Sequence, residues 1–294
     1  EMGARAFDVV VVGGGVVGAT LAAALRSGRA TSSLSVALVD RHAPTDGATL
    51  GRVPDARASA LSPASLGLLR RLGAFGEEAE RRSGVFTAMQ VWDATGGGCV
   101  RYEASDAGLP ELGRVVENAA LSAGLGEALS RKGVEVVAPA EVVRLDAGGA
   151  GSSSGSLAEV ELAGGEVLRA RLVVGADGAS SRVRSLAGLR SVGWGYGQAA
   201  AVGTVRTTAS HSTAFQVFLP TGPLALLPVL GGEYSNVVWS TTPAEARALA
   251  RAPPEEFAAA VDDAFHGRGR WARARESSAS SALSALQLLS GRGP

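Results

Sequence analysis

An α/β fold with one parallel sheet and one antiparallel sheet is predicted by three features of the sequence. Residues 9–12 form an apolar run that leads into Gly13-x-Gly15-x-x-Gly18, and the apolar run over 172–174 leads into a second glycine-containing turn. After residue 198, strand-like runs follow one another with no helical pattern between them. Strands separated by helices indicate a parallel sheet, whereas consecutive strands indicate an antiparallel one. The chain is therefore expected to form two domains.

The first stretch has the spacing of a strand–helix–strand unit that binds a dinucleotide. Gly13 permits a tight turn out of the strand, Gly15 lets a pyrophosphate approach the backbone, and Gly18 lets the helix pack close to the sheet. The phosphates would then lie at the helix N-terminus, where the macrodipole favours anions. Asp40 ends the second strand and is placed to accept hydrogen bonds from the adenosine ribose.

Two other interpretations of this stretch are weaker. A plain buried strand with a glycine turn does not require a glycine triplet, a helix and an acid at these distances. A membrane span over 9–25 would need ~20 apolar residues. The three consecutive glycines and the flanking Asp8 favour a buried parallel strand instead.

Composition excludes several classes of function. The chain of 294 residues has 28 basic and 28 acidic side chains, so nothing indicates a nucleic-acid partner. Cys99 is the single cysteine, which excludes an intrachain disulfide and a cysteine metal cluster. His42, His211 and His266 lie far apart with no ligand spacing, so no metal site is expected.

Arg57 follows a loop that glycines and prolines predict over 41–56. Two roles are open for it: a solvated loop arginine, or a bidentate partner of the pyrophosphate. Ser62 followed by Pro63 then predicts the start of a helix over 63–72, with leucines at 66, 69 and 72 on its apolar face.

The middle of the chain alternates between strands and one further helix. The helix follows Asn118, carries leucines at 121, 125 and 129, and ends at Lys132-Gly133. Strands are predicted over 89–93, 134–137, 141–145, 158–162 and 167–174. Residues 148–156 form a Gly/Ser-rich loop, which is more typical of a tolerated insertion than of a site.

Asp177 lies in the second informative stretch, where a buried strand runs into Gly-Ala-Asp-Gly. Such a turn directs a carboxylate and free backbone N–H groups beyond the carboxyl end of the strand. A plain NAD dehydrogenase does not need this second nucleotide-facing turn, whereas a long flavin dinucleotide does.

The last third of the chain predicts the second domain. Strands are expected over 199–206, 214–219, 224–229 and 235–240, followed by a helix from Pro254 to about Phe265. Trp194 and Tyr196, just before these strands, are expected to pack at a hinge rather than to contact a ligand.

These motifs resemble those of the class A FAD-dependent aromatic hydroxylases, and among them the ubiquinone-biosynthesis monooxygenases, closest to their eukaryotic mitochondrial members. The resemblance covers the chain to about Phe265. It rests on the two glycine motifs and on further segments, namely Arg57-Ala-Ser-Ala-Leu-Ser-Pro, Met89-Gln-Val-Trp-Asp, Val116-Glu117-Asn118, Trp194-x-Tyr196-x-Gln198, Phe218-Leu-Pro-Thr-Gly-Pro-Leu-Ala-Leu-Leu-Pro228 and Val237-Val-Trp-Ser-Thr241.

The resemblance implies a Rossmann-like FAD-binding domain of the glutathione-reductase type over 1–190. An antiparallel substrate domain over 191–294 is inserted, and strands near 86–102 belong with it. It implies that FAD is the cofactor, with its adenosine and pyrophosphate held by Gly13, Gly15, Gly18, Asp40 and Arg57. Asp177 would help to hold the flavin side.

The resemblance also implies the reaction and its setting. A flavin C4a-hydroperoxide formed with O₂ would hydroxylate the ring of a polyprenylated phenol or benzoate in ubiquinone biosynthesis. Ferredoxin and ferredoxin reductase would supply electrons. The enzyme would work within a coenzyme Q biosynthetic complex, in peripheral contact with the matrix side of the mitochondrial inner membrane.

One family motif is not found. The third flavin motif, a strand ending in Gly-Asp-Ala-Ala-His or a close variant, does not occur between residue 240 and Pro294. The first residue is Glu1 rather than methionine, and no targeting segment is identified. These observations predict a chain that is incomplete at its C-terminus.

Two alternatives therefore accompany the hydroxylase hypothesis. One is a truncated, non-catalytic nucleotide-binding chain, and the other is a flavin reductase of the geranylgeranyl-reductase type, which needs no O₂. No residue matches a catalytic acid or base of the family, so no catalytic residue is predicted.

Overall fold

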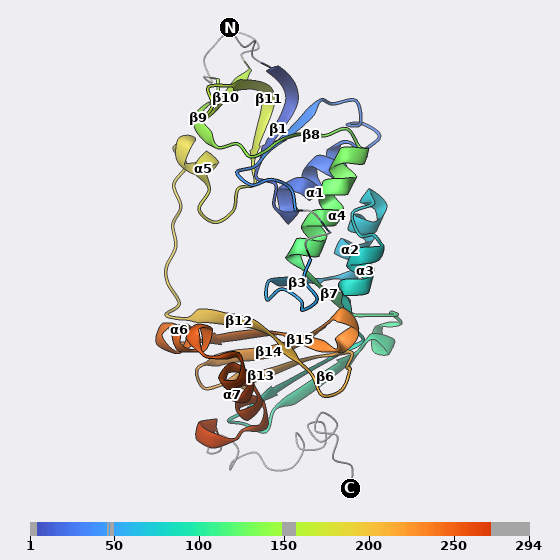
Figure 1. The fold of residues 1–294 in the computed structure, drawn as a ribbon, viewed down its shortest axis with the longest axis vertical. Helices are drawn as coiled ribbons and strands as arrows, with labels where there is room; N and C mark the ends of the chain where they lie inside the picture. Colours follow the sequence, from blue (N-terminus) through green and yellow to red (C-terminus); the bar gives the residue numbers. More distant parts are fainter. Residues whose placement is uncertain (1–4, 46, 48–49, 149–156, 272–294) are drawn as a thin grey trace. The chain divides into compact units, whose positions relative to one another are not determined.

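The computed structural model describes residues 5–45, 47, 50–148 and 157–271 (Figure 1). The chain divides into two compact units, and each unit is built from several segments. Unit 1 contains 1–50, 67–78 and 119–193, and unit 2 contains 51–66, 79–118 and 194–294. A domain boundary was predicted after residue 190, with strands near 86–102 assigned to the second domain. The structural division falls after 193 and also assigns 51–66 to unit 2.

Unit 1 is built on a six-stranded sheet in the order β8-β2-β1-β11-β10-β9. β1 (Arg5–Val12) is central and pairs in parallel with β2 (Val36–Val39) and β11 (Val167–Gly175). β8 (Glu135–Val137) extends the parallel part, whereas β10 (Ala158–Leu162) and β9 (Val142–Asp146) add an antiparallel hairpin. The Gly/Ser-rich loop expected over 148–156 falls almost entirely outside the described residues.

The core of unit 1 explains why its first strand ends in the apolar run 9–12. Val10 and Val11 point to opposite faces of the sheet, and both are fully buried. One face packs with Leu168 and Ala170 of β11. A central parallel strand is covered on both faces, so the carboxyl half of β1, residues 9–12, is apolar at every position rather than alternating.

Three predicted helices lie wholly or mainly in unit 1, and they begin and end where the sequence signals lie. α1 (Val16–Leu25) follows the glycine turn, and α2 (Pro63–Leu72) spans the predicted range. α4 (Asn118–Arg131) ends before Gly133, which adopts φ +65°. The leucines at 66, 69 and 72 and those at 121, 125 and 129 are buried, as their spacing predicted. α5 (Arg182–Leu186) is a short helix after β11.

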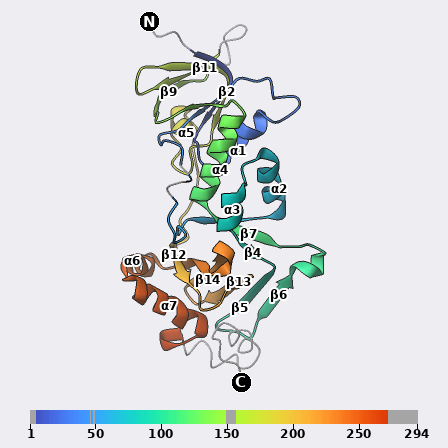
Figure 2. The ribbon, with the colours of Figure 1, turned by 45° about the vertical axis from the view of Figure 1, so that its right-hand side comes forward.

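Unit 2 is built on a second six-stranded sheet in the order β12-β15-β14-β13-β5-β6. The four strands of the last third of the chain form antiparallel pairs: β12 (Ala199–Arg206), β15 (Tyr234–Thr241), β14 (Gly222–Val229) and β13 (Thr213–Leu219). β5 (Ala88–Asp93) and β6 (Cys99–Glu103) complete one edge (Figure 2). A purely antiparallel sheet was expected, but β5 pairs with β13 in parallel, so this sheet contains one parallel pair.

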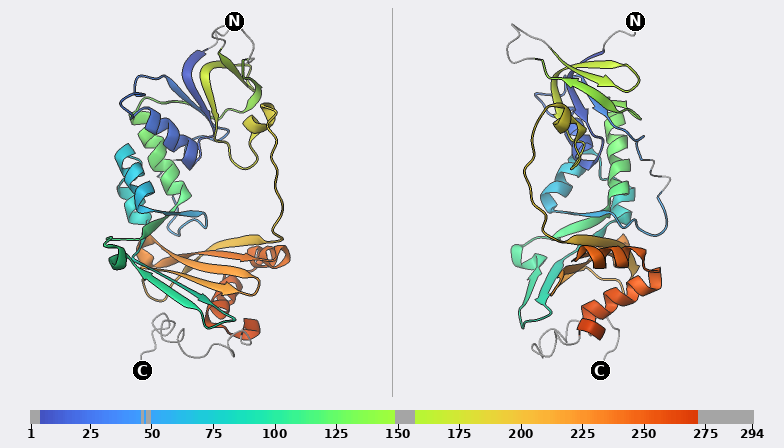
Figure 3. Two further views of the ribbon diagram at one scale, coloured as in Figure 1. Left: turned by 180° about the vertical axis from the view of Figure 1, so that it is seen from behind. Right: turned by 90° about the vertical axis from the view of Figure 1, so that its left-hand side faces the viewer.

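Two helices cover one face of this sheet (Figure 3). α7 (Pro254–His266) was predicted, whereas α6 (Pro243–Arg251) was not. The signals for α6 are Thr242, whose side chain accepts from the Glu245 N–H, and a proline at the first helical position. Trp92 packs edge-on against Phe265 with ring centroids 5.4 Å apart, which joins the sheet to α7.

The rest of unit 2 is a small three-stranded sheet. Its central strand β7 (Gly113–Glu117) pairs with β3 (Ala58–Leu61) and β4 (Gly84–Phe86). α3 (Glu77–Arg82) immediately precedes β4. Trp194 and Tyr196, expected to pack at a hinge, are exposed, and their rings contact each other.

Within the described ranges, no helix combines the length and the apolar character needed to cross a membrane. The same part of the chain contains no cluster of His, Cys, Asp or Glu able to hold a metal ion.

Candidate dinucleotide-binding site

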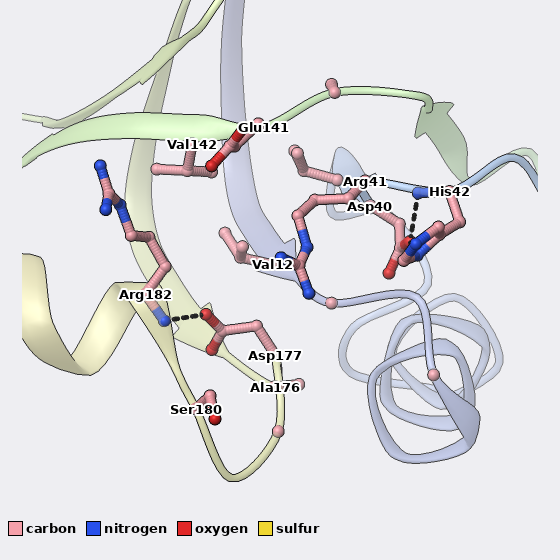
Figure 4. Close-up of a pocket in the computed structure, with 15 residues that line it drawn as sticks. Val12, Asp40, Arg41, His42, Glu141, Val142, Ala176, Asp177, Ser180 and Arg182 are labelled. Atoms are coloured by element: carbon pink, nitrogen blue, oxygen red, sulfur yellow. Dashed lines mark hydrogen bonds and ion pairs between the residues drawn. The ribbon is translucent and has the colours of Figure 1, made fainter.

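A cavity of about 500 Å³ opens at the carboxyl ends of β1, β2 and β11 in unit 1 (Figure 4). Because the three strands are parallel, the turns that follow them meet at one edge of the sheet. The cavity brings together four of the predicted site residues: Gly13, Gly15, Asp40 and Asp177. Its volume lies within the range of ligand pockets.

The three motif glycines differ in what surrounds them. A Cβ on Gly13, at φ +109°, would lie 2.4 Å from the Ala176 carbonyl oxygen. A Cβ on Gly18 would lie 2.0 Å from the Gly13 carbonyl oxygen. Both positions therefore require glycine to close the packing between α1, β1 and the turn after β11.

Gly15 differs because a Cβ there would meet no atom within 4 Å. Packing within the chain therefore gives no reason for glycine at this position. Gly15 is the N-cap of α1, and no side chain caps the helix. The first-turn N–H groups of an α-helix lack intrahelical partners, so this end suits an anion. Open space at Gly15 beside uncapped N–H groups fits a pyrophosphate.

Asp40 is held in place by the backbone around it. Its Oδ2 accepts a hydrogen bond of 2.6 Å from the Gly14 N–H, and its Oδ1 accepts one of 2.7 Å from the His42 N–H. Each carboxylate oxygen has two acceptor sites, so Asp40 retains capacity for ribose hydroxyls. The bond to Gly14 also ties the acid to the glycine turn.

Asp177 is engaged by the start of α5. Its Oδ1 accepts from the Ser181 hydroxyl at 2.6 Å, and its Oδ2 accepts from the N–H groups of Arg182 at 2.6 Å and Val183 at 3.1 Å. Burial alone would raise the pKa of Asp177, but the hydrogen bonds from Ser181, Val183 and Arg182 outweigh burial and lower it. The carboxylate is thus ionised and lines the cavity while it fixes the turn after β11.

Two arginines that line the cavity were not predicted as site residues. Arg41 follows Asp40 directly, and Arg182 begins α5. Among the described residues, neither guanidinium has a hydrogen-bonding or ion-pair partner. The position of Arg41 just beyond a strand end was the available signal, since residues there face the ligand edge of a parallel sheet.

Arg57 belongs to unit 2 and is not among the residues that line this cavity. Its side chain is 79% exposed, and its Nη2 lies 3.9 Å from Asp55 Oδ2. Its predicted contact with the pyrophosphate stays a prediction.

A protein-family model described as "FAD binding domain" matches residues 6–280. The chain belongs to this FAD-binding family. The match confirms the predicted family resemblance and the prediction of FAD as the cofactor.

Curated relatives carry names that refer to ubiquinone. The mouse protein "Ubiquinone biosynthesis monooxygenase COQ6, mitochondrial" is 34% identical over 88% of this chain and 55% of its own length. The Escherichia coli "3-demethoxyubiquinol 3-hydroxylase" is 33% identical over 89% of this chain and 64% of its own length. The Rhodospirillum rubrum "Ubiquinone hydroxylase UbiL" is 35% identical over 90% of this chain and 59% of its own length. The chain thus spans between 55% and 64% of the length of these relatives.

Solved structures confirm the fold class. PqsL, a probable FAD-dependent monooxygenase from Pseudomonas aeruginosa, superimposes with a TM-score of 0.66 at 23% identity, covering 83% of this chain and 63% of PqsL. The tetrameric form of 2-methyl-3-hydroxypyridine-5-carboxylic acid oxygenase gives a TM-score of 0.67 at 19% identity, covering 94% and 68%, respectively. At these identities the likeness establishes the shared fold.

Proposed function

We propose that this protein is a FAD-dependent monooxygenase that hydroxylates the aromatic ring of a polyprenylated phenol or benzoate in ubiquinone biosynthesis. The observation that carries the proposal is the similarity, at 33–35% identity over about nine-tenths of the chain, to relatives named for ubiquinone hydroxylation. The cavity in unit 1 supports it, because its glycine turn, helix N-terminus and strand-end acid suit the adenosine diphosphate part of FAD.

Each predicted site residue has a role in this proposal. Gly13 and Gly18 close the packing of the βαβ unit, and Gly15 leaves room for the pyrophosphate at the start of α1. Asp40 accepts hydrogen bonds from the ribose hydroxyls. Asp177 holds the turn after β11 on the flavin side.

Two further parts of the proposal concern Arg57 and the cofactor itself. The Arg57 guanidinium pairs with the pyrophosphate in a bidentate manner. When bound, FAD supplies the activation of O₂, while the chain binds the cofactor, orients the ring and excludes water.

The partners and the location belong to the same proposal. The substrate is a polyprenylated phenolic ring used together with O₂, and ferredoxin with ferredoxin reductase supplies the electrons. The protein works at the matrix side of the mitochondrial inner membrane within a coenzyme Q biosynthetic complex. The support is the resemblance to the mitochondrial members of the family and the names of the mouse and Xenopus tropicalis relatives, both of which are called mitochondrial.

The test combines FAD titration with oxygen uptake. The purified chain is titrated with FAD while quenching of flavin fluorescence is followed. A reduced-flavin assay then measures O₂ consumption with and without a prenylated phenol. Saturable FAD binding and substrate-dependent O₂ consumption are expected.

Other outcomes separate the alternatives. Saturation of a prenyl double bond without O₂ consumption would favour a flavin reductase. A folded chain that binds no FAD would favour the non-catalytic alternative.

A further inference from the structure

Arg41 is an exposed arginine that follows β2 and lines the cavity of unit 1. Its side chain points from the end of β2 toward Val12, the last residue of β1 (Figure 4). The guanidinium therefore faces the strand that leads into the glycine turn. All the residues that line this cavity belong to unit 1, so the site is contained in one compact unit.

The carboxylate next to Arg41 in the sequence is engaged by other groups. Asp40 accepts from the Gly14 N–H at 2.6 Å and from the His42 N–H at 2.7 Å. Within the part of the chain that the structure describes, no group accepts a hydrogen bond from the Arg41 guanidinium. Its N–H donors are in the rigid planar arrangement that matches two oxygens of one phosphate. Arg41 thus presents an unused phosphate-binding group to the cavity.

The charges around the cavity indicate why a cation is needed there. Its described lining contains three carboxylates, Asp40, Glu141 and Asp177, but only two arginines, Arg41 and Arg182. A bound pyrophosphate brings further negative charge to this acidic lining. The N-terminus of α1 offers only about half an elementary charge. A guanidinium beside the phosphates is therefore required to offset the repulsion from the carboxylates.

Of the two arginines, Arg41 is the one on the adenosine side. β1 lies between β2 and β11 in the sheet, so Arg41 and Arg182 stand on opposite sides of β1. Two strand spacings separate these sides by about 10 Å. The Arg182 side chain extends toward Val142, whereas that of Arg41 points at Val12 (Figure 4).

We propose that Arg41 binds the phosphate that is attached to the adenosine, with two of its N–H groups on two phosphate oxygens. Asp40 would hold the ribose of the same nucleotide, and Arg41 would supply the charge that lets its phosphate lie close to that acid. This inference rests on the proposed function, because it takes FAD as the dinucleotide. It concerns a residue of unit 1 and does not depend on the role of Arg57.

The test compares three ligands in the wild type and in Arg41→Ala. The Kd for FAD is measured by quenching of flavin fluorescence, and the Kd values for ADP and adenosine are measured by displacement of FAD. Arg41→Ala is expected to weaken both FAD and ADP roughly 10- to 100-fold, as for a hydrogen bond to a charged group. The Kd for adenosine, which has no phosphate, should change by less than about twofold. An equal loss for adenosine and ADP would overturn the proposal.

Arg182→Ala is the matched control, because it removes the same charge from the other side of the cavity. In 0.15 M salt the Debye length of about 8 Å is shorter than the separation of about 10 Å between the two sides. Arg182→Ala is therefore expected to change the Kd for ADP by less than about threefold. If it weakened ADP binding as much as Arg41→Ala, a general field rather than a contact would be responsible, and the proposal would fail.

Arg41→Lys tests the chemical basis of the contact. Lysine keeps the charge but loses the planar pair of donors, so its Kd for ADP should lie between those of the wild type and Arg41→Ala. If Arg41→Lys bound ADP no better than Arg41→Ala, the charge would contribute nothing, contrary to the proposal. Urea midpoints should be the same for all these variants, because Arg41 is exposed.

The failures are distinguishable. If the wild-type chain binds neither FAD nor ADP, the proposed function fails, and this inference fails with it. If the wild type binds both ligands and Arg41→Ala binds ADP as tightly as the wild type, FAD binding stands and only the role of Arg41 falls.

Discussion

At the scale of single residues, the three motif glycines fall into two groups according to what surrounds them. Gly13 and Gly18 face backbone atoms at distances that no side chain tolerates, whereas Gly15 faces open space. One motif thus contains two residues needed for packing and one residue whose proposed role is to leave room for the ligand.

Gly15→Val is expected to fold and to lose FAD binding by about 100-fold, which corresponds to about 3 kcal/mol of steric overlap with the pyrophosphate. Because no atom lies within 4 Å of the new Cβ, the unfolding free energy should fall by only about 1 kcal/mol, through a poorer N-cap. FAD titration and urea denaturation measure the two effects. Gly18→Val is the contrasting variant and should not yield folded protein; unchanged flavin content in Gly15→Val would refute the site assignment.

Asp177→Ala is expected to lower the unfolding free energy by about 1 kcal/mol at pH 7, because the carboxylate caps the start of α5. The pKa of Asp177 is lowered in the folded state. The ionised carboxylate therefore contributes its full stabilisation above the pKa of an unfolded-state aspartate, about 3.9. The stabilisation is lost as the pH falls through the folded pKa.

Urea midpoints of wild type and Asp177→Ala, taken from pH 7 down to pH 2, check this prediction. The difference between the two proteins should shrink as the medium becomes acidic. A difference that stayed constant over this range would show that Asp177 stabilises the turn without its charge.

At the scale of elements, a buried ion pair connects α3 with β7. Glu117→Ala is expected to destabilise unit 2 by about 3–5 kcal/mol, because Arg82 is then left charged and buried. Replacing both residues, as Arg82→Met with Glu117→Leu, should cost less than Glu117→Ala alone.

Urea denaturation measures these changes in the unfolding free energy. The exposed ion pair between Glu127 and Arg131 on α4 is the comparison in the same experiment. Its side chains are 71% and 56% exposed, so Glu127→Ala should change the unfolding free energy by less than about 0.5 kcal/mol. A similar cost for the two ion pairs would mean that burial does not determine their contribution.

His211 connects the start of β13 with β15 through bonds to the Thr213 carbonyl and the Ser235 hydroxyl. Burial lowers the pKa of His211, and the bond to the Thr213 carbonyl only partly opposes this effect. When the pKa of a histidine is lower in the folded than in the unfolded state, its contribution to stability is complete above the unfolded pKa of about 6.5. This contribution is lost as the pH falls from the unfolded pKa toward the folded pKa.

Urea midpoints at pH 8 and pH 5 test this expectation. The wild type should lose stability between these values, and His211→Asn should lose less over the same interval. If both proteins changed equally, groups other than His211 would be responsible for the pH dependence.

At the scale of the whole molecule, local sequence patterns predicted the individual helices and strands better than they predicted which strands pair. The strands and helices of unit 1 follow from apolar runs, caps and glycine stops, and four of the six predicted site residues line one cavity because parallel strands bring their ends together. Gly18 acts through packing instead, and the role of Arg57 stays a prediction.

What the sequence did not predict depends on contacts between distant segments. The parallel pairing of β5 with β13 leaves no local signature, because either partner alone has the alternation of any strand. α6 was missed because its apolar face is small, with Ala246 and Leu249 as its buried residues. The hydrogen bonds from the Asp55 N–H to Glu117 and from Asn236 to the Ala56 carbonyl join positions far apart in the chain.

The interleaving of the two units sets an order for folding during synthesis. Once residue 193 has left the ribosome, every strand of the unit 1 sheet is present, whereas unit 2 has only β3 to β7. The β5–β6 hairpin must then wait with one edge unpaired until β13 emerges. An unpaired edge invites pairing with another chain. Until β13 is available, this edge of β5 is therefore open to pairing with another chain.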